Sequence, residues 1–91
     1  GLLVQQTLSD LFVGADRLLH NPLDGTAARL VIDGRDQARS LRLPFGFERT
    51  QWRAILAAAD AVADSFEPGG IDDDVIREHA AALRALLRDL V

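Results

Sequence analysis

The spacing of the large apolar residues changes twice along this chain of 91 residues. Before residue 21 and after residue 49 they recur at steps of three and four, which is the period of an amphipathic helix. Between residues 26 and 45 they alternate instead, with Leu30 and Ile32 in one arm and Leu41 and Leu43 in the other. Alternation of this kind is typical of a half-buried strand. The pattern therefore predicts an α+β fold, a small helix, β-hairpin, helix, helix domain.

Three helices are predicted around this region. The first covers residues 3–20 and ends at Asn21-Pro22, because the residue before a proline is driven out of the α region. The second covers residues 50–66 and is followed by a strong break at residues 68–70. The third begins after Asp72, whose carboxylate can cap it, and continues to the end of the chain.

The predicted hairpin has arms at residues 29–33 and 39–43, joined by a loop in which Gly34 permits positive φ. A broken helix over residues 27–43 is the alternative interpretation. Gly14 costs about 1 kcal/mol relative to Ala in a helix interior, and either close contact with the hairpin or plain tolerance explains it. Because 91 residues leave room for one core, we predict a single interaction domain, residues 1–91.

Charge is distributed unevenly along the chain. The net charge is −4, yet residues 29–53 hold six arginines against three carboxylates, a local charge of +3. We predict that a partner binds here, with these candidate residues: Arg29, Arg35, Arg39, Arg42 and Trp52. Alternatively the arginines only solvate the hairpin and pair with the acidic helices, at about 0 to 1 kcal/mol per exposed pair. For Trp52, which opens an apolar stripe, a place in the core is the favoured alternative to an interface anchor.

No residue pattern indicates catalysis, a cofactor or a metal. The run Asp72-Asp73-Asp74 fits a helix cap and lacks the alternating ligands of a calcium loop. His20 and His79 have no second ligand at metal spacing, and no serine lies in a nucleophile elbow. We therefore predict a protein that is not an enzyme and needs no cofactor or metal.

Composition bears on location and on assembly. The chain has no cysteine, which fits a reducing cytoplasm, and no apolar run near the roughly 20 residues that cross a bilayer. We expect a soluble cytoplasmic protein without membrane contact. Three apolar stripes and a two-stranded sheet exceed what one thin core covers. This predicts a homodimer, joined through an outer strand or through the stripe of the last helix.

The segment Leu41-Arg42-Leu43-Pro44-Phe45, within a hairpin-to-helix pattern over residues 27–66, resembles small accessory domains associated with bacterial CHAT/caspase-like conflict-system proteases. The resemblance implies an adaptor or regulatory partner of a larger bacterial effector. No catalytic residue carries over, because the protease chemistry would lie in another protein.

We therefore predict a non-enzymatic protein-protein interaction module. The alternative is a small nucleic-acid-binding protein that uses the arginine-rich hairpin. The acidic pI of about 4.9 and the lack of exposed aromatic residues oppose that alternative.

Overall fold

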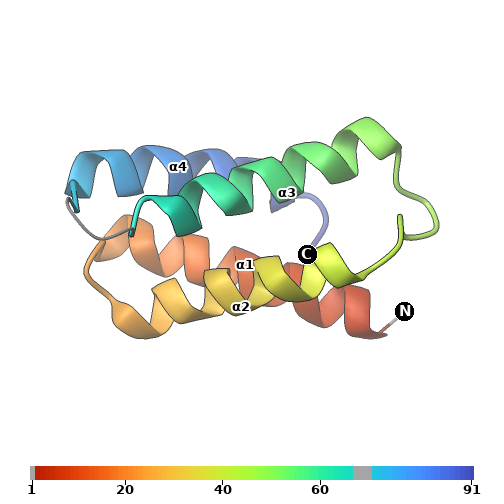
Figure 1. Ribbon diagram of the computed structural model, residues 1–91, viewed down its shortest axis with the longest axis horizontal. Coiled ribbons are helices and arrows are strands. Elements are labelled where there is room, and N and C mark those ends of the chain that lie inside the picture. Colours follow the sequence, from red (N-terminus) through yellow and green to blue (C-terminus); the bar gives the residue numbers. More distant parts are fainter. Residues whose placement is uncertain (1, 67–70) are drawn as a thin grey trace.

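Four helices make up the part of the chain that the computed structural model describes, residues 2–66 and 71–91. They are α1 (Leu2–His20), α2 (Gly25–Ser40), α3 (Arg49–Asp64) and α4 (Asp73–Leu87). The contacting pairs are α1 with α2, α2 with α3, α3 with α4, and α4 with α1. The helices thus form an up-and-down bundle (Figure 1). The α2–α3 connection lies at the same end as the start of α1, and the α1–α2 connection lies at the opposite end.

The predicted β-hairpin is wrong, and the fold is all-α rather than α+β. Residues 2–66 and 71–91 contain no strand, and the segment assigned to the hairpin lies mainly in the continuous helix α2. The residues that α2 buries follow steps of four, three and four: Thr26 is exposed, and the buried positions are Ala27, Val31, Gly34 and Ala38. This stripe is inconspicuous in the sequence because alanine and glycine contribute little hydrophobicity. Leu30 and Ile32, which produce the apparent alternation, are only half-buried.

Helix α2 begins at a side-chain cap. The carboxylate of Asp24 accepts a hydrogen bond from the backbone N–H of Ala27 at 3.0 Å, and it pairs with Arg17 at 3.0 Å. The Ala27 hydrogen bond, with the added effect of Arg17, holds the pKa of Asp24 below its ordinary value. The cap therefore fixes the start of α2 and also links it to α1.

Helices α1 and α2 approach each other closely at two glycines. A Cβ atom on Gly14 would lie 2.7 Å from Cγ2 of Val31 and 2.9 Å from the carbonyl oxygen of Ala27. A Cβ atom on Gly34 would lie 2.9 Å from Cδ2 of Leu11. The close contact considered for Gly14 is therefore real, but its partner is a helix. Gly34 does not turn the chain; it makes room for α1.

The other three helices are confirmed, except that α4 ends at Leu87 and does not continue to the end of the chain. Helices α1 and α3 begin within one residue of the predicted positions, and Asp72 caps α4 by accepting from the N–H groups of Asp74 and Val75. The break predicted at residues 68–70 lies outside the described residues. Side chains from all four helices form the core, and its largest fully buried members are Leu8, Leu11, Leu18, Val31, Ile55, Val62, Ile76, Leu83 and Leu87. No described helix combines the length and the apolar character needed to cross a membrane.

Candidate interaction surface

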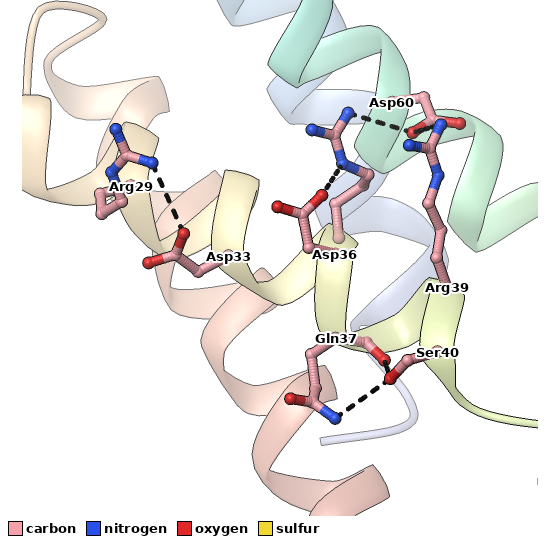
Figure 2. Close-up of polar contacts among 8 residues, drawn as sticks. Arg29, Asp33, Asp36, Gln37, Arg39, Ser40 and Asp60 are labelled. Carbon is pink, nitrogen blue, oxygen red and sulfur yellow. Dashed lines mark hydrogen bonds and ion pairs between the residues drawn. The ribbon is translucent and has the colours of Figure 1, made fainter.

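Two of the candidate arginines belong to an ion-pair network that joins α2 to α3 (Figure 2). Oδ1 of Asp60 in α3 accepts a hydrogen bond from Nη1 of Arg35 at 3.3 Å and forms an ion pair with Nη2 of Arg39 at 2.7 Å. Nε of Arg35 also donates to Asp36 at 2.8 Å. The Arg35 side chain is only 15% exposed, so its guanidinium serves the helix interface and not the outer surface.

The protonation of Arg35 follows from these neighbours. Burial of the side chain opposes its charge, but the hydrogen bonds and charges of Asp36 and Asp60 outweigh burial, so the pKa of Arg35 is raised above its ordinary value. Arg35 is therefore a permanent cation whose charge two carboxylates balance. The network stabilises the contact of α2 with α3.

Arg29 pairs within its own helix. Its Nη1 atom lies 3.5 Å from Oδ1 of Asp33, one turn further along α2, and both side chains are about two-thirds exposed (Figure 2). With this pair, the three arginines of α2 are matched by three carboxylates: Asp33, Asp36 and Asp60. Helix α2 consequently carries no net positive face.

The unmatched positive charge lies further along the chain. Arg42 is exposed in the α2–α3 connection, residues 41–48, and Arg49 and Arg53 are exposed in the first turns of α3. None of these three takes part in an ion pair with another described residue. Because Glu48 is the one carboxylate in residues 41–53, the local charge is three minus one, or +2. Of the three arginines, the sequence analysis singled out Arg42 alone.

A tight turn in the α2–α3 connection presents an aromatic side chain to solvent. The N–H of Phe47 donates to the carbonyl oxygen of Pro44 at 3.1 Å, and Gly46 has a φ of +89°. A glycine with positive φ at the third position is the signature of a type II turn. Phe45 occupies the second position and is fully exposed, and Leu43 beside it is 39% exposed.

Residues on the core side hold the turn in place. The ring of Phe47 meets Trp52 edge to face, with centroids 5.4 Å apart and planes at 73°. Trp52 is 4% exposed and belongs to the core, as the favoured sequence interpretation has it. On the other side, Leu41 packs against the core and its N–H donates to the carbonyl oxygen of Ala38 at 3.1 Å. Trp52 therefore supports the turn that displays Phe45 and does not itself reach solvent.

We define the docking turn as the exposed set formed by two apolar residues and three arginines: Arg42, Leu43, Phe45, Arg49 and Arg53. Of the five residues predicted from the sequence, Arg42 belongs to the docking turn, Trp52 is buried next to it, and the other three lie earlier, in α2. Gly46 after Phe45 is the signal that could have found the turn, because glycine readily takes the positive φ that the third position of a type II turn requires.

Two serines and one histidine have side chains that contact backbone carbonyl oxygens of the helices. The hydroxyls of Ser40 and Ser65 donate to the carbonyl oxygens of Gln37 and Val62, and Nδ1 of His20 lies 2.8 Å from the carbonyl oxygen of Asp16. Within residues 2–66 and 71–91, no group of three or more His, Cys, Asp or Glu could hold a metal ion. A groove of about 550 Å³ runs between α1 and α2, over Gly34, with mostly polar side chains along it.

Comparisons of the chain with protein families, with curated proteins and with solved structures found no match. The arrangement of exposed and paired side chains is therefore the basis for a functional conclusion.

Proposed function

We propose that this chain is a non-enzymatic protein-protein interaction module that binds its partner through the docking turn. The observation that carries the proposal is Phe45, fully exposed on a turn that Trp52 and Phe47 fix from below. A lone exposed apolar side chain is ordinary on a protein surface. An exposed aromatic residue on a structured turn, close in sequence to arginines that pair with no described residue, is typical of an interface anchor.

The proposed role is that of an adaptor or regulator of a larger bacterial effector. The resemblance of residues 41–45 to accessory domains of conflict-system proteases supports it, because that segment includes three residues of the docking turn: Arg42, Leu43 and Phe45. The hairpin half of the resemblance is corrected, since residues 25–40 are helical.

A homodimer stays a prediction, and one of the two interfaces expected for it is excluded. No strand exists among the described residues, so no edge strand is available there. In the stripe of α4, Ile76, Ala80, Leu83 and Leu87 are buried within the bundle, whereas Val75 and Leu86 are exposed. A second copy could bind these exposed residues or the docking turn.

One observation favours the alternative function, nucleic-acid binding. Phe45 is an exposed aromatic ring close in sequence to Arg42 and Arg49, and such a ring can stack on a base while the arginines meet phosphates. Against this, the arginines of α2 are already matched by carboxylates, and the chain has a net charge of −4. We therefore rank this function second.

The proposed function is tested by capture with a matched control. The wild-type chain, Phe45→Ser and Val13→Ser are immobilised and exposed to an extract of cells that express the chain. Val13 is the control because it is also an exposed apolar residue but lies in α1. A protein retained by wild type and by Val13→Ser, lost with Phe45→Ser, and bound again from purified components supports the proposal. Capture that is equal for all three variants contradicts it.

Nucleic acid is tested separately with fluorescent single-stranded DNA and RNA of about 20 nucleotides. We expect no affinity beyond ordinary non-specific binding. A Kd tighter than roughly 1 µM at 150 mM salt, weakened by changing Arg42, Arg49 and Arg53 to Gln, would show that the alternative is the right function.

A further inference from the structure

We infer that the docking turn recognises a protein surface with an apolar pocket and an acidic rim, and that its residues have separate tasks. Phe45 fills the pocket, and Arg42, Arg49 and Arg53 face the carboxylates of the rim. This inference rests on the proposed function and adds the chemistry of the partner.

The acidic rim follows from the charges that the bundle leaves unmatched. In α2 each arginine has a carboxylate within 3.5 Å, whereas residues 41–53 keep a charge of +2. The acidic start of α4 lies at the opposite end of a bundle whose longest extent is 37 Å (Figure 1). The Debye length in physiological salt is about 8 Å, so those aspartates do not screen the docking turn. Carboxylates of a partner would therefore meet three exposed arginines that no described carboxylate pairs with.

The apolar pocket follows from the shape of the turn. Phe45 is the one fully exposed aromatic side chain among the described residues, and Leu43, two residues earlier, is partly exposed. Because the Pro44–Phe47 hydrogen bond and the Phe47–Trp52 contact hold the turn, Phe45 loses little backbone freedom when it is buried. A single projecting ring fits a concave site better than a flat one.

The same features favour a protein over an extended polyanion. Three arginines are few, and a long nucleic acid or an anionic bilayer would also meet the acidic remainder of the molecule, whose total charge is −4. A compact acidic rim meets the docking turn alone. Nucleic acid and lipid therefore enter the test as competing outcomes.

The probe is a library of random 16-residue peptides closed by a disulfide, whose rings can enclose a projecting side chain; it is displayed on phage and selected against the full chain, with Phe45→Ser used to remove unspecific binders. We expect the selected peptides to combine apolar residues with Asp and Glu. Phe45→Ser should weaken a selected peptide about 30-fold or more, mainly through faster dissociation, as for an interface anchor.

The arginine variants test the rim. The triple change of Arg42, Arg49 and Arg53 to Gln should slow association about tenfold at 50 mM salt and much less at 500 mM salt, because exposed charges steer encounter. Arg77→Gln is the matched control. It removes one positive charge from an exposed arginine near the start of α4, as each of the three changes does in the docking turn, and it should leave both rates unchanged.

Three results would overturn the inference: selected peptides without acidic residues, association rates indifferent to the arginine changes, or no peptide that depends on Phe45. Tighter Phe45-dependent binding to oligonucleotides, or to phosphatidylcholine vesicles with 30% phosphatidylserine, would overturn it as well. If a native protein is still captured through Phe45 in any of these cases, the proposed function stands and only the partner's chemistry is wrong. If capture ignores Phe45, the proposed function itself fails.

Discussion

Helix α2 and the segment that follows it contain the same number of arginines and use them in opposite ways. In α2, Arg29, Arg35 and Arg39 meet three carboxylates, and one of these, Asp60, lies 25 residues from Arg35 in sequence. Residues 41–53 contain three arginines and one carboxylate, and no described residue forms an ion pair with these arginines. The comparison teaches that arginine content does not locate a binding surface. The position of the carboxylates in space decides which arginines are available.

Apolar residues show the same contrast between these two segments. Helix α2 buries small residues, Ala27, Gly34 and Ala38 among them, and so lies close against α1. The α2–α3 connection exposes a phenylalanine, one of the largest side chains. Helix α2 has paired arginines and small residues packed against α1, which is consistent with a structural role. The turn exposes Phe45 and arginines that pair with no described residue, which is consistent with a role in recognition.

The largest expected effect tests the close fit of α2. We expect Gly14→Ala to lower the free energy of unfolding by about 1 to 2 kcal/mol, because overpacking costs about 1 to 3 kcal/mol and the helix propensity of alanine returns up to about 1 kcal/mol. The new Cβ would press on the backbone oxygen of Ala27, which cannot rotate away. Urea unfolding followed by circular dichroism measures the change.

The control for this substitution is Gly25→Ala, at the start of α2, where a Cβ atom would have nothing within 4 Å. It should leave stability unchanged or raise it slightly. Equal effects at Gly14 and Gly25 would show that α2 does not depend on close packing with α1.

A smaller effect is expected from the ion-pair network. Asp60→Asn should lower the free energy of unfolding by about 1 kcal/mol, because it weakens the acceptor shared by Arg39 and the mostly buried Arg35. Asp33→Asn, at an exposed pair, and Arg42→Gln, in the docking turn, should each stay within about 0.5 kcal/mol of wild type. Thermal unfolding of the four proteins in parallel ranks them. A loss at Arg42 as large as that at Asp60 would erase the distinction between the two segments.

The smallest effect concerns the charge at the start of α2. The folded-state pKa of Asp24 lies below its ordinary value of 3.8, so this carboxylate adds stability above about pH 4 and loses it as the pH falls through the folded-state pKa. Asp24→Asn keeps a capping oxygen but removes the charge. It should therefore be slightly less stable than wild type at pH 7 and equal to it near pH 2. Melting curves across this range check the expectation; a difference that does not change with pH would contradict it.

The sequence predicted those helices whose buried residues are large. Leu8, Leu11 and Leu18 mark one face of α1, and Ile76, Leu83 and Leu87 mark one face of α4, so the period of 3.6 is visible in the letters. In α2 the buried face is small, and Gly34 reads as a turn although it serves a helix contact. The helical period is present there in steps of four, three and four, but three of its four buried positions are alanine or glycine, which contribute little hydrophobicity.

The docking turn was predictable only in part. Gly46 favours a turn that needs positive φ, and this could have been stated from sequence. The exposure of Phe45 depends on Phe47 taking the inward position against Trp52, a choice between two phenylalanines that packing makes. Likewise, predicting that Arg35 and Arg39 are paired requires knowing that α3 places Asp60 beside α2.

The contact between Phe47 and Trp52 also gives the molecule a built-in optical reporter. Trp52 is the only tryptophan of the chain, so the indole emission of the protein comes from one position, directly beneath the turn that carries Phe45. Loosening of the turn admits water to that ring and shifts its emission to longer wavelength, whereas far-ultraviolet dichroism follows the four helices. The two signals separate movement of the turn from unfolding of the bundle, without a label on either.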